Sequence, residues 1–332
     1  MENVPKTAIL DIGNDARRQF IDAQAVFTAW EAATKSATEV RGGMYWKVQG
    51  KSAYLIRTSP ANSQKSLGPR SVETEVIYRR FVERKAHVES RIADLAAELA
   101  RHQRMNRALF VGRAPQILVD ILNVLARAGL AEYFVVVGTH ALYAYEAAAG
   151  VRLGPADALA TRDVDLLWDT RKRVRFLAQM KFLGSSMIGL LKKVDPSFEI
   201  RDDQAYTATN SKGFEVDIIR REAVDGDPHP LKMTDDEADF WVVQAKRAGV
   251  LLSTARFSCM IVSPSGHMAR MHTIAPLAFS EFKQWMAAQP DRDPMKKQRD
   301  MQQAALAQTL VEEYLPQLLC PDSGAGTAPA QV

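Results

Sequence analysis

One continuous apolar run, Tyr-Phe-Val-Val-Val at residues 133–137, constrains the fold of this chain more than any other feature. Strands that are buried on both faces carry such runs, so we predict a central strand here. Gly138 and Thr139 end the run, and residues 140–149 have helical character. This strand–turn–helix order places backbone N–H groups and the Thr139 hydroxyl at a helix N-terminus, which is a natural seat for a phosphate group.

Three aspartates follow this unit along the chain. Asp163 and Asp165 lie two residues apart on a predicted strand at 163–168, so their side chains share one face. Asp217 lies on another predicted strand, at 214–219. Close carboxylates repel one another, and a divalent cation relieves that repulsion. Mg²⁺ prefers oxygen ligands, commonly carboxylates together with phosphate oxygens, and Mn²⁺ suits the same ligands. We therefore expect these three aspartates to hold two Mg²⁺ ions about 3.5–4 Å apart.

The N-terminal third has a different pattern. Two β-prone runs around Gly50-Lys51 predict a hairpin. Residues 58–70 are rich in turn formers and predict an exposed loop. Residues 73–107 contain no Gly or Pro and predict one long helix, with Leu95 and Leu99 on its buried side. The strand expected at 257–262 is the last one, and further helices are expected at 23–33, 115–128, 171–183, 276–286 and 295–315.

Composition is that of an ordinary globular protein. The chain has 332 residues, of which 47% are hydrophobic and 25% are charged, and this suggests two or three domains. The net charge of +4 permits a nucleic acid or a nucleotide as partner without demanding one. Cys259 and Cys320 have neither the number nor the spacing of a disulfide framework or a zinc site. No secretory signal or membrane span is predicted, so we expect a cytoplasmic location.

Four regions are expected along the chain. They are an N-terminal hairpin and long-helix region at 1–110, a core at 111–265, a helical C-terminal region at 266–320, and a disordered tail at 321–332.

The motif set resembles a known family. Gly138-Thr139 at a strand end, Asp163-Val164-Asp165 and Asp217 resemble the nucleotidyltransferase fold shared by DNA polymerase β, kanamycin nucleotidyltransferase and the nucleotidyltransferase toxins of bacteria. Thr139 differs from the commoner Ser or Gly, because it keeps a hydroxyl but adds a methyl group. A closer resemblance, over roughly residues 110–310, is to bacterial nucleotidyltransferase-fold proteins of largely unassigned function. It implies an α+β core with a mixed sheet, flanked by the N-terminal region and the C-terminal helices.

The resemblance also implies an activity. A nucleoside monophosphate would pass from an NTP to a hydroxyl acceptor, with release of pyrophosphate. Asp163 and Asp165 would hold both metal ions, while Asp217 would bind the ion that activates the hydroxyl or accept its proton. Gly138, Thr139 and Lys283 would bind the triphosphate. RNA, especially a tRNA end, is the favoured acceptor, and a protein or a small molecule are alternatives. A toxin–antitoxin or phage-defence setting follows by analogy with the toxins.

Other interpretations stay open at this stage. Lys283 could lie on a solvated helix face, and Glu215 is either a fourth acid or the wet end of its strand. Asp300 is expected to pair with Lys297, three residues earlier. His140 fits a packed or capping residue better than a metal ligand. The whole chain could also be a non-catalytic nucleotide or RNA sensor, or a protein-interaction module. Dinucleotide-binding, P-loop and His-Glu-x-x-His motifs do not occur, which disfavours those enzyme classes.

Overall fold

The computed structural model describes residues 9–60, 62–154, 159, 161–224, 227 and 231–319. The tail expected at 321–332 and Cys320 lie outside these residues. The chain divides into two compact units: Met1–Arg17 with Phe110–Val332 form the larger, and Arg18–Leu109 form the smaller.

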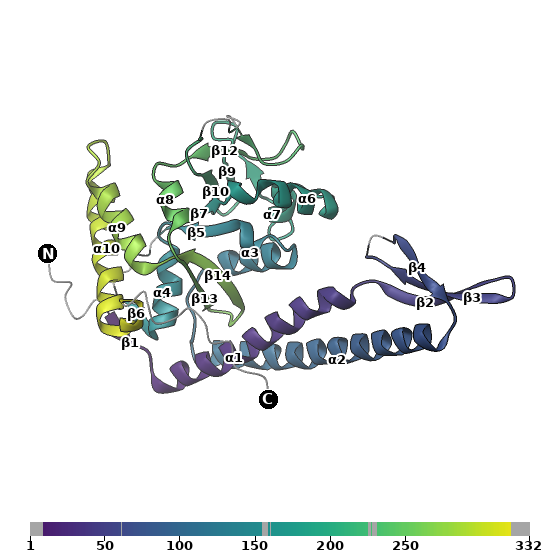
Figure 1. Ribbon diagram of the computed structural model, residues 1–332. Helices are drawn as coiled ribbons and strands as arrows, with labels where there is room; N and C mark the ends of the chain where they lie inside the picture. The colour runs from purple at the N-terminus through teal and green to yellow at the C-terminus, as the bar shows by residue number, and fades with distance from the viewer. Residues whose placement is uncertain are drawn as a thin grey trace. The chain divides into compact units, whose positions relative to one another are not determined.

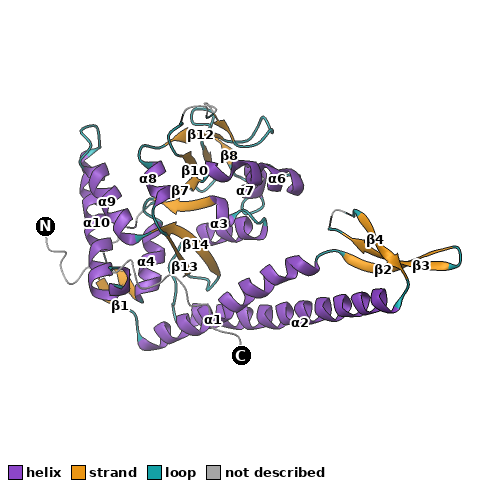
Figure 2. Cartoon of the chain, in the orientation of Figure 1, coloured by secondary structure: helices purple, strands orange, loops and turns teal. Residues whose placement is uncertain are grey.

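A mixed sheet forms the centre of the larger unit (Figures 1 and 2). The strand order is β11-β12-β10-β7-β5-β14-β13, and β8 and β9 extend the sheet beside β10. β7 runs parallel to β10 and antiparallel to β5. The strand bounds are β5 (Phe134–Val137), β7 (Asp163–Trp168), β8 (Glu199–Ile200), β9 (Thr207–Thr209), β10 (Glu215–Arg220), β11 (Leu231–Lys232), β12 (Trp241–Gln244), β13 (Arg256–Val262) and β14 (Met268–Ile274). The predicted α+β fold with a mixed sheet is confirmed.

Helices cover this sheet. They are α3 (Gln116–Arg127), α4 (Ala141–Ala149), α6 (Arg173–Leu183), α7 (Met187–Lys192), α8 (Ala248–Ser253), α9 (Pro276–Ala287) and α10 (Pro294–Tyr314). In Figure 1, α4, α9 and α10 lie on one side of strands β13 and β14, and α3, α6 and α7 lie on the other. None of the described helices combines the length and apolar character needed to cross a membrane.

Tyr145 fixes α4 in place. Its side chain is fully buried, its hydroxyl donates to the Ile274 carbonyl at 2.8 Å, and its ring packs edge-on against Phe257 and Phe279. One side chain therefore joins α4 to β13, β14 and α9. Since α4 begins just after Gly138 and Thr139, this packing also fixes the turn that precedes it.

Strand β14 corrects the prediction that the strand at 257–262 is the last. It pairs antiparallel with β13 and parallel with β5, so it lies inside the sheet. Its sequence, Met-Ala-Arg-Met-His-Thr-Ile, interrupts the apolar pattern with Arg270 and His272, which hid it from pattern analysis. The boundary expected at 265 assigns this central strand to the C-terminal region.

The first described residues belong with the larger unit. Strand β1 (Ile9–Asp11) pairs antiparallel with β6 (Val151–Leu153). The chain then leaves along α1 (Asn14–Ala37) and returns at Phe110.

The smaller unit consists of two antiparallel helices and a three-stranded sheet. Gln19 of α1 donates to Asn106 of α2 (Val72–Ala108), whereas Glu39, beyond the other end of α1, pairs with Arg84. A capping box at Ser71 and Thr74 starts α2, which confirms the long helix. Leu95 and Leu99, expected on its buried side, are only half-buried.

The expected hairpin is present as β2 (Gly43–Gln49) and β3 (Ser52–Thr58). The loop expected at 58–70 is wrong over much of its length, because β4 (Gln64–Pro69) pairs with β3 there. Turn-forming residues in β4 concealed a strand whose pairing partner lies earlier in the chain.

A buried carboxylate provides a test of the larger unit. Asp169 is 1% exposed, and Arg171 and Arg256 donate to it at 2.7–3.1 Å. Burial raises the pKa of Asp169, but the two guanidinium groups outweigh it and hold the pKa below its usual range.

We expect Asp169→Asn to lower the free energy of unfolding by about 2 kcal/mol at pH 7, because two partly exposed cations lose their anion. A carboxylate with a lowered folded-state pKa stabilises the fold above about pH 4, and that contribution is lost as the pH falls through the folded-state pKa. The gap between variant and wild type should therefore be constant from pH 8 to 5 and close below about pH 4. Urea unfolding across this range measures it. Asp203→Asn, at an exposed ion pair with Arg201, should leave stability nearly unchanged.

Candidate active site

The pairing register of two neighbouring inner strands, β7 and β10, brings the predicted acids together. Asp165 of β7 pairs in register with Asp217 of β10, and Asp163 pairs with Glu215. In a parallel pair, residues in register point to the same face, and Asp163 and Asp165 share a face through alternation. The structure therefore places the three aspartates on one face of two neighbouring strands.

Gly138, which directly follows strand β5, borders this group of acids. Val137, the last residue of β5, pairs with Asp165, so the turn after β5 lies against the Asp165 carboxylate. Gly138 has a φ of 70°, and a Cβ atom there would lie 2.3 Å from Oδ2 of Asp165. Only glycine leaves room for the carboxylate to approach the backbone this closely.

The pKa of Asp165 is shifted by these crowded surroundings. Burial, together with the charges of Asp163 and Asp217, raises the pKa of Asp165 to about 7. Lys283 and Arg292 oppose the shift without cancelling it. Burial first, and mutual repulsion second, penalise the ionised form of Asp165, and a bound cation would relieve both.

The donor set fits a hard divalent ion. All three aspartates offer carboxylate oxygens, the ligands that Mg²⁺ prefers. Within the described part of the chain, no three acidic, His or Cys side chains converge closely enough to enclose an ion by themselves. Mg²⁺ in phosphate-transfer sites usually takes one or two carboxylates and completes its shell with water and phosphate oxygens, so an open set of carboxylates is compatible with it.

Neighbouring side chains orient each acid. Thr207 of β9 donates to Oδ1 of Asp217 at 2.6 Å, and Thr161 donates to Asp163. Burial, followed by the charges of Asp163 and Glu215, raises the pKa of Asp217 against the effect of that Thr207 hydrogen bond.

Glu215 has a partner of its own. Arg201 donates to Oε1 of Glu215 at 2.9 Å. Arg201, which also donates to Asp203, thus holds Glu215 in an ion pair, and the residue serves better as the outer edge of the site than as a fourth metal ligand.

The turn after Gly138 offers hydrogen-bond donors. The N–H groups of residues 141–143 donate to the carbonyls of residues 138–140, whereas those of Thr139 and His140 donate to no partner in the described structure. The Thr139 side chain is 6% exposed, and Nε2 of Gln303 donates to its hydroxyl at 3.0 Å. Sequence reasoning missed Gln303, which lies 164 residues from Thr139 along the chain.

Lys283 lies in a buried ion cluster. Its Nζ donates to Oδ1 of Asp300 at 2.9 Å, and Arg292 donates to Oδ2 of the same residue at 2.8 Å. Lys283 is 3% exposed and Asp300 is fully buried. The predicted pairing of Asp300 with Lys297 is therefore wrong, because the crossing of α9 and α10 brings stronger partners to Asp300. The solvated interpretation of Lys283 is also wrong.

His140 is a packed residue. It is 1% exposed and contacts the rings of Tyr143 and Phe214, and its side chain makes no capping hydrogen bond. Burial lowers the pKa of His140 to about 4, against the opposing influence of Asp163. The ring is therefore neutral at physiological pH.

Comparison with known proteins now gives a family. A family model described as nucleotidyltransferase matches residues 116–324. The chain belongs to this family. No protein of curated function and no solved structure matches the chain.

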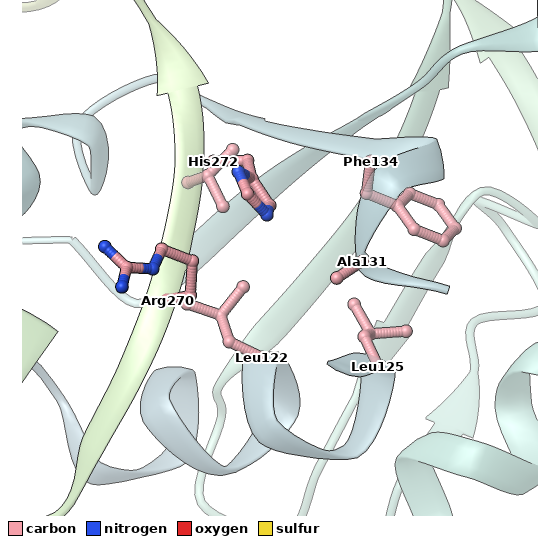
Figure 3. A pocket seen from close by; sticks show the side chains of 7 residues that line it. Leu122, Leu125, Ala131, Phe134, Arg270 and His272 are labelled. Atoms are coloured by element: carbon pink, nitrogen blue, oxygen red, sulfur yellow. The ribbon is translucent and has the colours of Figure 1, made fainter. Parts of the chain in front are cut away.

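The matched range contains every site residue of this nucleotidyltransferase, and it excludes the smaller unit. A small pocket of the enzyme lies elsewhere (Figure 3). Leu122 and Leu125 of α3 point toward Phe134 and His272 in it, and none of the site residues lines it.

The role of Gly138 can be separated from simple backbone strain. Gly184 of the nucleotidyltransferase has a similar φ of 57°, but a Cβ atom there would meet nothing within 4 Å. We expect Gly184→Ala to lower the free energy of unfolding by about 1–2 kcal/mol through strain alone. Gly138→Ala should cost clearly more and also weaken Mg²⁺-dependent NTP binding, because Asp165 must move.

Chemical unfolding and titration calorimetry with Mg²⁺ and ATP measure the two effects. Equal behaviour of the two variants in both measurements would contradict the close approach of Gly138 to Asp165.

Proposed function

We propose that this nucleotidyltransferase moves a nucleoside monophosphate from an NTP to a hydroxyl acceptor with the help of Mg²⁺. The observation that carries the proposal is the placement of Asp163, Asp165 and Asp217 on one face of two neighbouring strands, against the turn at Gly138. Carboxylates and N–H groups side by side suit a metal-bound triphosphate.

Each aspartate has a role in this proposal. Asp163 and Asp165 would hold the metal, and bound Mg²⁺ would supply charge neutralisation on the phosphate oxygens. Asp217 would hold the second ion or accept the proton of the acceptor hydroxyl. The acceptor oxygen forms a bond to the α-phosphorus, the bond to the bridging oxygen breaks, and pyrophosphate leaves with its electrons.

The phosphate chain would contact the turn and the helical pair. The N–H groups of Thr139 and His140, which donate to no partner among the described residues, would donate to phosphate oxygens. Lys283 is committed to Asp300, so it contributes positive potential near Asp165 in place of an exposed ammonium group. Arg292, with 23% of its side chain exposed, is the more accessible cation of this cluster.

Membership of the polymerase β-like superfamily and a bacterial toxin–antitoxin or phage-defence setting rest on the sequence resemblance and stay predictions. Among acceptors, an RNA end is favoured, with protein side chains and small molecules as alternatives. The second candidate function is a non-catalytic nucleotide or RNA sensor. Three carboxylates in one place favour the enzyme, because a binder that only recognises phosphate gains nothing from uncompensated negative charge.

The decisive assay incubates the protein with Mg²⁺ and each α-³²P-labelled NTP, with total RNA, lysate protein and small metabolites as separate acceptor pools. We expect label in one pool, and pyrophosphate in equal amount. Asp163→Asn and Asp217→Asn should each reduce transfer about 1,000-fold, since metal-assisted charge stabilisation is worth several kcal/mol.

Glu199→Gln is the matched control, because Glu199 is an exposed acid on β8 of the same sheet. It should transfer label as the wild type does. Tight Mg²⁺-dependent NTP binding without label transfer or pyrophosphate release in any pool would favour the sensor. Transfer that survives both aspartate substitutions would contradict the proposed site.

A further inference from the structure

The smaller unit carries an unusual distribution of charge. Between Glu39 and Glu73 the chain contains no acidic residue. The same stretch contains six basic residues, namely Arg41, Lys47, Lys51, Arg57, Lys65 and Arg70. Ordinary protein surfaces intersperse both signs, so a one-sign stretch on a folded sheet is a specific electrostatic feature. The stretch contains the whole of the three-stranded sheet β2–β3–β4.

One face of this sheet packs on α2. The ring of Trp46 lies 5.9 Å from that of Tyr78, and the Arg57 guanidinium lies 4.3 Å above the ring of Phe81. Trp46 pairs with Leu55 across the strands, and Leu55 is fully buried. This face therefore forms the core of the unit.

The other face carries tyrosine and lysine. Lys47 pairs directly with Tyr54 across β2 and β3, and Tyr45 lies two residues before Lys47, so the three side chains share one face. Tyr45 is 38% exposed, Lys47 is exposed, and Tyr54 is half-buried. Two flat rings beside an ammonium group form a surface on which bases can stack while a phosphate is bound.

The basic side chains of this sheet are available to a ligand. In the structure as described, Arg41, Lys47, Lys51 and Lys65 form no ion pair and donate no side-chain hydrogen bond. Arg57 and Arg70 are engaged, since Arg57 packs on Phe81 and Arg70 pairs with Glu75. Four unpaired cations on this sheet, in its hairpin turn and just before its first strand form a positive potential that attracts a polyanion.

We propose that the face of β2–β3–β4 that carries Tyr45, Lys47 and Tyr54 binds single-stranded RNA. Lysines at 47 and 51 contact phosphates, and the two tyrosines stack on unpaired bases. RNA fits this surface better than a lipid headgroup does, because stacking rings add a contact that a headgroup does not use. The inference rests on the proposed function, because the acceptor hydroxyl would then belong to RNA, whose ends carry ribose hydroxyls.

The test is a binding measurement that involves no transfer chemistry. Fluorescence anisotropy follows a fluorescein-labelled 20-nucleotide uridine RNA titrated with the full chain in EDTA, without NTP, at several salt concentrations. The double variant Lys47→Gln/Lys51→Gln should bind about tenfold more weakly. Its slope of log affinity against log salt should fall by about 1.4, because each phosphate contact on a single strand contributes roughly 0.7.

The tyrosines should behave differently. Tyr45→Ala should weaken binding about tenfold with an unchanged salt slope, because stacking releases no counterions. Tyr45→Phe should restore the affinity, because it keeps the ring. The same two substitutions at the half-buried Tyr54 should repeat this pattern, with thermal unfolding as a check on folding.

A matched control removes the same charge from the larger unit. Lys181→Gln/Lys192→Gln changes two exposed lysines, one on α6 and one on α7, and should leave RNA affinity nearly unchanged. Wild-type affinity and salt slope in the Lys47→Gln/Lys51→Gln variant would overturn the inference. So would binding to vesicles of phosphatidylserine and phosphatidylcholine without binding to the RNA.

Failure of this inference can be told apart from failure of the proposed function. RNA binding that depends on the sheet, without label transfer to any pool, would contradict the proposed function and support the RNA-binding surface. Label transfer to a protein or a small molecule, without RNA binding, would contradict the RNA-binding surface and support the nucleotidyltransferase activity.

Discussion

The arrangement of the site in the larger unit depends on the repulsion among three aspartate carboxylates on the neighbouring strands β7 and β10. Parallel pairing of β7 with β10 forces Asp165 and Asp217 into register, and strand alternation adds Asp163. Nothing in the strands themselves relieves this charge. The surrounding structure instead holds the acids in place: Thr161 and Thr207 donate to two of them, and the glycine turn after β5 confines the third. These contacts hold the acids close together in an arrangement whose repulsion a bound cation would relieve.

Helices α9 and α10 border the group of acids on a second side. Ser280 donates to the carbonyl of Ala304, and the Lys283–Asp300–Arg292 cluster joins the two helices through buried charges. A buried ion cluster contributes little net stability, because desolvation offsets attraction, but it tolerates few alternative arrangements. Gln303 of the same helix reaches the Thr139 hydroxyl. The position of α10 is therefore coupled to the turn that would receive the triphosphate.

The sequence was most informative where local rules are strict. Alternation on a strand and the order of Gly138, Asp163, Asp165 and Asp217 were enough to predict that the acids meet, since each rule concerns a few adjacent residues. It was least informative where partners lie far apart along the chain. The contact of Gln303 with Thr139 and the choice of Asp300 between Lys297 and Lys283 depend on how helices cross. Strands β4 and β14 escaped detection because turn formers or polar side chains interrupt their patterns, and pairing with a neighbour decides such strands.

The connection of the two units has a consequence for how this chain can vary. The smaller unit is an insertion between β1 and α3, not an appendage at one end, since β1 is paired with β6 of the larger unit. Two covalent crossings join the units, so the inserted segment can be exchanged as a cassette between residues 17 and 110 while the catalytic framework keeps both of its flanking pieces. A polypeptide break within the inserted sheet would leave the two fragments held together by the β1–β6 ladder and by the α1–α2 pair.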